Sequence, residues 1–171
     1  MSEIVNRVAN SAIVSLDLET YFQEGQRKSF DLRPYLFQEM IVREKEFRQM
    51  LRETDWEEFR DALVSVYCSA DAIIPTWAYM LVMTYLEGVV KEAVIGDPED
   101  LEKYVMTKAL QRINPKDFEG RPVVVKGCGK LPVPIHAYGE IVRILKGSAR
   151  SIMYGEPCST VPVYKAPRVG N

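Results

Sequence analysis

The sequence predicts an α/β fold: a single domain with a largely parallel sheet of four or five strands and helices on both faces. Valine-rich runs such as ALVSVYC (62–68) and RPVVVKGC (121–128) are typical of buried strands. Helical patterns of about 12 to 16 residues alternate with these runs, as in βαβ units. A chain of 171 residues, 47% of them hydrophobic, is long enough to bury a sizeable core in one domain.

The first sixty residues predict one strand and one long helix. Residues 13–18 form the strand, and a turn follows at Glu24 and Gly25. From Asp31, an N-cap residue, the segment up to about residue 53 has apolar residues at helical spacing. We therefore expect an N-terminal strand and helix in residues 1–60, followed by a βαβ core in residues 61–171.

The core segment alternates strands and helices up to the C-terminus. Pro75 and Asp97 are suited to begin helices, and acidic residues after Asp97 suit the N-terminal end of a helix dipole. The last segment, SIMYGEPCSTVPVYK, predicts one strand or two strands separated by Pro157. The predicted strands are 62–68, 92–97, 121–128 and this last segment, and the predicted helices are 76–90, 97–113 and 134–146.

Composition and charge narrow the function classes. The net charge is −2 and the sequence pI is about 5.6, so no overall basic charge favours nucleic acid. The most apolar segment, 72–86, is shorter than the ~20 residues that a membrane-spanning helix needs, and the N-terminal residues do not resemble a signal peptide. We expect a cytoplasmic protein with neither a nucleic-acid nor a membrane partner; an oligomer is compatible with this sequence.

The three cysteines are the candidate site residues. Cys68 and Cys128 each follow a predicted strand, and Cys158 lies in the loop-like GEPCSTVP. A weak repeat supports this placement, because Cys68 and Cys128 both precede a Pro-x-x-Ala-Tyr motif that begins a helix. Ligands of open parallel sheets bind at the carboxyl ends of the strands. The alternative is that each cysteine is a small buried hydrophobic residue.

Three thiolates that converge would suit zinc, iron or an iron–sulfur cluster. A closed zinc site needs a fourth ligand, for which Asp71, His136 and Glu156 are candidates. The residues themselves favour a simpler explanation: Asp71 as a turn residue, and His136, the only histidine, as an exposed residue of a first helical turn. Without a fourth protein ligand, the open position would take water, substrate or sulfide.

Two other classes of function stay open. An enzyme could use the open metal position or one activated thiolate, for instance a sulfur carrier at Cys158. A non-metal interaction module would keep the cysteines as structural residues. No Walker A motif, dinucleotide-binding glycine motif or G-x-S-x-G elbow occurs in the chain.

Several segments together resemble an uncharacterised bacterial family, the domain-of-unknown-function family numbered 2480. These segments are EIVNRVANS, VYCSADAIIPTWAYMLV, VVVKGCGKLPVP with its AY, and SIMYGEPCSTVPVYK. The resemblance covers nearly the whole chain. Genes of this family often neighbour those of the Suf-type iron–sulfur cluster assembly system, so the resemblance implies an accessory role in cluster assembly or in iron or sulfur handling, with assembly proteins as partners. It carries over Cys68, Asp71, Cys128 and Cys158 as site residues, whereas His136 is not part of the family's motif.

Overall fold

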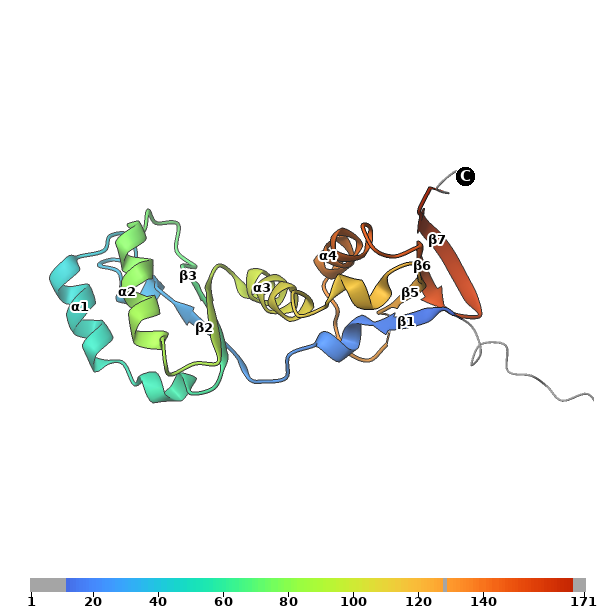
Figure 1. Cartoon of the computed structure of the whole chain (residues 1–171). Helices are drawn as coiled ribbons and strands as arrows, with labels where there is room; N and C mark the ends of the chain where they lie inside the picture. Colours follow the sequence, from blue (N-terminus) through green and yellow to red (C-terminus); the bar gives the residue numbers. More distant parts are fainter. Residues whose placement is uncertain (1–11, 128, 168–171) are drawn as a thin grey trace, which may run out of the picture. The chain divides into compact units, whose positions relative to one another are not determined.

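The computed structural model describes residues 12–127 and 129–167. The chain divides into two compact units, and each unit has its own sheet (Figure 1). Unit 1 consists of the described residues of Met1–Gln23 and Met106–Asn171. Unit 2 consists of Glu24–Val105.

Unit 1 contains a four-stranded sheet in the order β1-β5-β6-β7. Its strands are β1 (Val14–Asp17), β5 (Pro122–Lys126), β6 (Ser151–Glu156) and β7 (Ser159–Lys165). The first three are parallel, and β7 returns antiparallel to β6. The helical segments are the 3-10 helices η1 (Leu18–Tyr21) and η4 (Pro115–Phe118), the α-helix α4 (Ile135–Leu145), and the last part of α3 (Pro98–Leu110).

The core of unit 1 lies between α4 and one face of its sheet. Ala137, Ile141 and Leu145 recur along α4 at intervals of four residues, and all three are buried. They share one hydrophobic cluster with alternate residues of β5, such as Val123 and Val125. The apolar stripe of α4 therefore holds the helix against the sheet.

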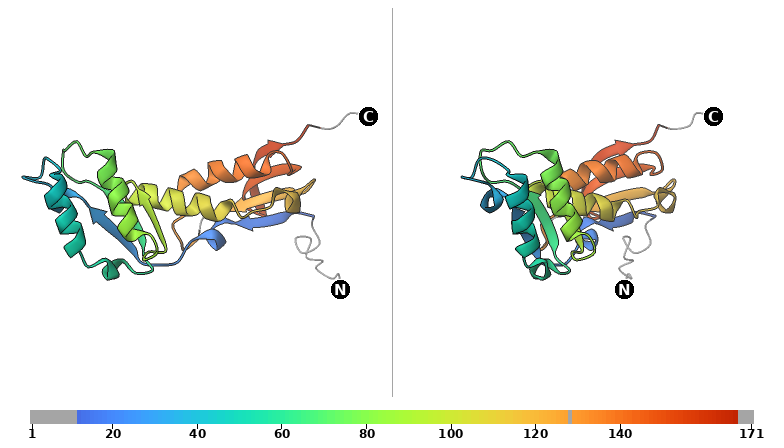
Figure 2. Two further views of the ribbon diagram at one scale, coloured as in Figure 1. Left: turned by 60° about the vertical axis from the view of Figure 1, so that its left-hand side comes forward. Right: turned by 90° about the vertical axis from the view of Figure 1, so that its left-hand side faces the viewer.

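Unit 2 contains a three-stranded parallel sheet in the order β2-β3-β4. Its strands are β2 (Arg27–Asp31), β3 (Leu63–Tyr67) and β4 (Glu92–Ile95). Its helical segments are η2 (Arg33–Tyr35), α1 (Glu44–Glu53), η3 (Trp56–Phe59), α2 (Thr76–Leu86) and the first part of α3. The two complete α-helices, α1 and α2, lie side by side in Figures 1 and 2.

The sheet of unit 2 is covered on both faces. Val64 and Val66 belong to the hydrophobic cluster that includes buried residues of α1 and α2. Leu63 belongs instead to a cluster with Leu101 and Val105 of α3. Because successive residues of a strand point to opposite faces, β3 is buried on both sides.

The α/β class and the largely parallel strand pairing are confirmed, with the strands divided between two sheets. The long helix expected from Asp31 is wrong, because Asp31 ends β2 and the α-helix begins only at Glu44. Between them the chain turns sharply at Gln38 and Glu39, both at positive φ. Strand β2 was missed because its sequence, RKSFD, has only one large apolar residue.

The two units share the same internal topology. In each, the first strand pairs in parallel with the second, and a helix connects the second strand to a parallel third. From η3 onward, the first residues of matching elements are 59 positions apart in the sequence. The matching pairs are η3 with η4, β3 with β5, α2 with α4, and β4 with β6; they begin at Trp56 and Pro115, Leu63 and Pro122, Thr76 and Ile135, and Glu92 and Ser151.

Details of the backbone repeat with the same spacing. Asp61 and Gly120, 59 positions apart, both have positive φ. The amide of Lys91 donates to the carbonyl of Ala62 at 2.9 Å, and the amide of Arg150 donates to the carbonyl of Arg121 at 2.9 Å. The first strands match as well, since Asp31 pairs with Tyr67 and Asp17 with Lys126. The chain therefore contains two copies of one ββαβ arrangement. In the sequence, the copy that forms unit 2 is inserted between β1 and β5 of the copy that forms unit 1.

Candidate functional site

The carboxyl ends of three parallel strands in unit 1 carry charged side chains. Asp17 ends β1, Lys126 ends β5 and Glu156 ends β6. Together with Glu19 and the following loop they line a polar pocket of about 120 Å³. This is the edge of a parallel sheet at which ligands usually bind. The full lining is Asp17, Glu19, Lys126, Gly127, Gly129 and Glu156.

Lys126 is held by the carboxylates around it. Its Nζ lies 3.1 Å from Oε2 of Glu156. This ion pair and hydrogen bond raise the pKa of Lys126, and the charges of Asp17 and Glu19 add to the effect. The single ammonium of the pocket is thus already paired with one carboxylate.

Glu19 is positioned by the backbone of the loop after β5. Its Oε2 accepts a hydrogen bond from the amide of Lys130 at 3.3 Å. A Cβ at Gly129 would lie 2.1 Å from Oε1 of Glu19, so only glycine lets the loop approach the carboxylate this closely. The Oε1 atom itself is buried and has no hydrogen-bond partner among the described residues. Burying a carboxylate oxygen without a hydrogen-bond donor lowers the stability of the folded protein.

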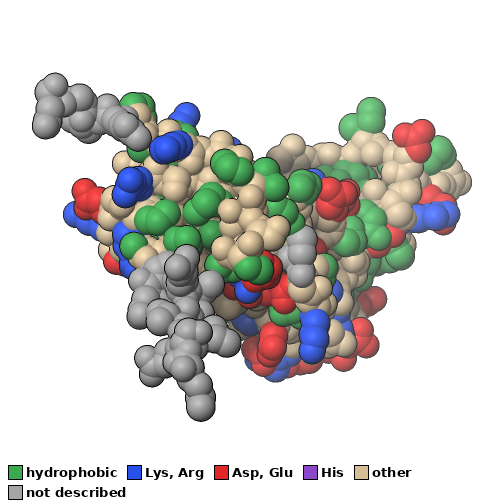
Figure 3. Space-filling model, turned by 90° about the vertical axis from the view of Figure 1, so that its right-hand side faces the viewer, with side chains coloured by type: hydrophobic (Ala, Val, Ile, Leu, Met, Phe, Trp, Pro, Cys, Tyr) green, Lys and Arg blue, Asp and Glu red, His purple; other side chains and the backbone are tan. Residues whose placement is uncertain are grey.

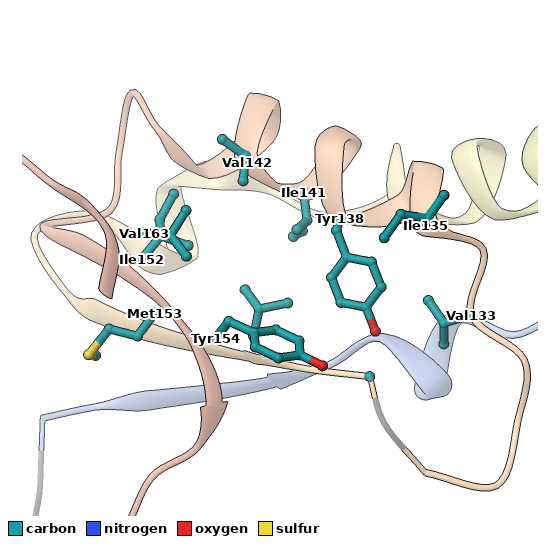
Figure 4. Close-up of a pocket in the computed structure, with 11 residues that line it drawn as sticks. Val133, Ile135, Tyr138, Ile141, Val142, Ile152, Met153, Tyr154 and Val163 are labelled. Atoms are coloured by element: carbon teal, nitrogen blue, oxygen red, sulfur yellow. The ribbon is translucent and has the colours of Figure 1, made fainter. Parts of the chain in front are cut away.

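An apolar groove of about 510 Å³ lies beside the polar pocket (Figure 4). It is formed by α4, by the end of β5 and the loop that follows, and by β6 and β7. No residue of its lining that the structure describes carries a charged side chain. The residues are Val125, Gly127, Val133, Ile135, Tyr138, Ile141, Val142, Ile152, Met153, Tyr154 and Val163. Pockets of 300 to 1,000 Å³ with such linings are typical small-molecule sites.

Two tyrosines form part of the groove wall. The rings of Tyr138 on α4 and Tyr154 on β6 meet edge to face, with their centroids 5.8 Å apart. Figure 4 shows both hydroxyl groups directed toward the end of β5. A Cβ at Gly127 would lie 1.9 Å from the Tyr138 hydroxyl oxygen, so the absence of a side chain at Gly127 makes room for this ring. Gly127 lines the groove and the polar pocket alike.

Part of the groove wall is open to solvent. Ile135 at the start of α4 is 84% exposed, and Val163 on the edge strand β7 is 55% exposed. The space-filling view shows hydrophobic side chains gathered on the face turned to the viewer (Figure 3). Exposed apolar residues at the mouth of an apolar groove are typical of a binding surface.

Cys68 lies in unit 2, directly after β3. Its thiol is half-buried and lies 3.7 Å from the carbonyl oxygen of Ala70. Burial raises the pKa of Tyr79 on α2, and the charge of Cys68 contributes to this rise. Asp71, expected as a partner in the same loop, is exposed, and no hydrogen bond joins it to the described residues.

A different carboxylate organises the loop that contains Cys68. Asp31, at the end of β2, accepts hydrogen bonds from the amide of Ser69 at 2.9 Å and from its hydroxyl at 2.5 Å. Burial alone would raise the pKa of Asp31, but these bonds and the amide of Arg33 lower it overall. Asp31 and its counterpart Asp17 each accept from the amide two residues later, at 3.0 Å. Neither aspartate was predicted at the end of a strand, and Asp31 was expected to cap a helix, although the repeated FDL and LDL mark both positions.

Cys158 and His136 belong to unit 1, whereas Cys68 belongs to unit 2. Cys158 is an exposed residue of the turn between β6 and β7. Nε2 of His136 lies 2.9 Å from the Thr107 hydroxyl and 3.7 Å from a carboxylate oxygen of Glu140. The third expected ligand, Cys128, lies outside the described residues.

The spacing of the two copies changes how the cysteines correspond. The strand before Cys68 ends at Tyr67, and the matching strand ends at Lys126. The residue that corresponds to Cys68 is therefore Gly127, while Cys128 corresponds to Ser69. The cysteines occupy neighbouring, non-equivalent loop positions in the two copies, so the repeat does not by itself bring thiols to one place.

No group of three histidine, cysteine, aspartate or glutamate residues suited to hold a metal ion occurs within 12–127 and 129–167. In the same part of the chain, no helix is long and apolar enough to cross a membrane. Fold and groove define an α/β protein of two ββαβ copies, one of which has an apolar groove between its helix α4 and the strands β5, β6 and β7.

A family model described as "Protein of unknown function (DUF2480)" matches residues 2–166, and the chain belongs to this family. No curated protein and no solved structure matches the chain. The resemblance seen in the sequence is thus confirmed for the family.

Proposed function

We propose that this protein binds a small, largely apolar organic molecule in the groove between α4 and the β6–β7 hairpin of unit 1. The observation that supports this most directly is the groove of about 510 Å³ between α4, the end of β5 and the β6–β7 hairpin, with no charged residue among the described residues of its lining. Among the described residues of its wall, the ionisable groups are two tyrosine hydroxyls. The geometry therefore supports binding more than acid–base chemistry.

A large side chain introduced on β7, at the mouth of the groove, tests this proposal. We expect the neutral fluorescent probe N-phenyl-1-naphthylamine to bind with a dissociation constant on the order of 10 µM, because its rings bury apolar surface. Val163→Trp should weaken binding about tenfold or more, since the indole fills the groove mouth. The matched control is Val161→Trp, on the same strand and 63% exposed but not part of the lining. Equal affinity of both variants in a fluorescence titration would contradict the proposal.

Metal or iron–sulfur cluster binding in the cytoplasm is a second candidate function. In support of it, Cys68 and Cys158 are free thiols that are not fully buried, and each follows a strand. Together with Cys128 they supply soft ligands for zinc, iron or a cluster. The sequence resemblance implies a role as an accessory of iron–sulfur cluster assembly, with assembly proteins as partners, and the matching family is of unknown function.

Elemental analysis of anaerobically purified protein tests this second candidate. About one zinc or iron per chain, or a cluster, is expected, and Cys68→Ser, Cys128→Ser and Cys158→Ser should each lower the content severalfold, because a three-thiolate site loses a ligand. Asp71→Asn and His136→Gln test the proposed fourth ligands. A variant that keeps its full metal content would show that the substituted residue is not a ligand. Full metal content in a Cys68→Ser variant would remove Cys68 from the ligand set.

A further inference from the structure

The apolar groove and the polar pocket adjoin at one residue. Gly127 lines both, so a molecule seated in the groove with one end at Gly127 presents that end to the pocket. The inference that follows rests on the proposed function of the groove. It concerns the chemistry of the ligand's polar end.

The pocket has a surplus of negative charge. Asp17, Glu19 and Glu156 supply three carboxylates, and Lys126 is the one cation among the described residues of the lining. Lys126 is already paired with Glu156 at 3.1 Å. An anionic head group would meet two carboxylates that this lysine does not neutralise, whereas a cationic head group complements them.

One atom of the pocket lacks the donor that it needs. Oε1 of Glu19 is buried without a hydrogen-bond partner in the described structure, while Oε2 is fixed by the amide of Lys130. An N–H group of a ligand would give this oxygen a charge-assisted hydrogen bond.

We propose that the ligand is an amphipathic amine, whose hydrocarbon or aromatic body lies in the groove and whose ammonium group binds beside Glu19 in the pocket formed at the ends of β1, β5 and β6. An alkylammonium is charged at pH 7, like a lysine side chain. The apolar body supplies most of the affinity, and the carboxylates select the head group.

Three probes with one alkyl chain and different head groups test the assignment: octylamine, octan-1-ol and octanoate. Each is titrated against the full chain loaded with N-phenyl-1-naphthylamine. We expect octylamine to compete with the dye with a dissociation constant about tenfold lower than that of octan-1-ol. Octanoate should be the weakest competitor, because of the surplus carboxylates. Raising the ionic strength should reduce the preference for the amine only modestly, since Glu19 is partly buried.

Glu19→Gln is the decisive variant, because the amide oxygen still accepts from Lys130 while the charge is lost. It should lower the affinity for octylamine about tenfold and leave that for octan-1-ol unchanged. Glu119→Gln, at an exposed site outside both linings, is the matched control and should change neither.

The outcomes separate the two levels of the proposal. If the dye and all three octyl compounds fail to bind, the groove is not a ligand site and the proposed function falls. If octan-1-ol and octanoate bind as tightly as octylamine, the groove stands and the amine assignment is overturned. An amine preference that survives Glu19→Gln in full overturns the role of Glu19.

Discussion

Alanine at Leu145 is expected to lower the free energy of unfolding by about 2–5 kcal/mol, and alanine at Leu86 by a similar amount. Both side chains are fully buried near the end of the helix that follows the second strand of their unit, 59 positions apart. Each packs in the main hydrophobic cluster of its own unit. Truncation to alanine removes three side-chain carbons and leaves a cavity that the surrounding core fills only in part.

Urea unfolding followed by circular dichroism measures the effect. Because a chain with two cores can unfold in two steps, each transition is fitted separately. Leu86→Ala and Leu145→Ala should then act on different transitions if two are seen. Ile135→Ala, at the exposed start of α4, is the control and should change stability by no more than about 0.5 kcal/mol. A loss below that level at Leu145 would contradict the packing of α4 described above.

The buried strands β3 and β5 could be predicted because their sequences are mostly apolar and rich in valine. Strand β2 could not, since it is an edge strand whose pairing with β3 depends on backbone hydrogen bonds rather than on apolar side chains. The helix expected from Asp31 does not form, because a contact distant in the sequence fixes this residue. Asp31 is fixed at a strand end by Ser69, which is 38 positions away in the sequence.

The groove escaped prediction because its residues look like core residues in the sequence. Tyr138 and Ile141 sit at helical spacing in an apolar run, which is how a buried helix face looks. What opens the groove is β7, which leaves Val163 exposed at the edge of the sheet, and this requires knowing the strand order. The 59-residue spacing of the two copies corrects the alignment that the cysteine motif suggested, because Cys68 corresponds to Gly127 and not to Cys128.

Alanine at Gly127 is expected to destabilise the protein by about 1–3 kcal/mol, whereas alanine at Gly139 should stabilise it by about 0.5–1 kcal/mol. A methyl group at Gly127 would overlap the hydroxyl oxygen and ring of Tyr138, at 1.9 and 2.7 Å. A methyl group at Gly139, inside α4, meets nothing within 4 Å and raises helix propensity. The same substitution thus has opposite signs at two nearby glycines.

Thermal and urea unfolding of the two variants give both signs in one experiment. Gly127→Ala should also weaken dye binding in the groove severalfold, because the Tyr138 ring can no longer hold its place in the wall. Combining it with Tyr138→Leu, which removes the ring, should recover part of the lost stability, since the two sites are in contact. A Gly127→Ala variant as stable as the wild type, with unchanged dye affinity, would show that Tyr138 does not lie over the end of β5 and that the groove is not built as described.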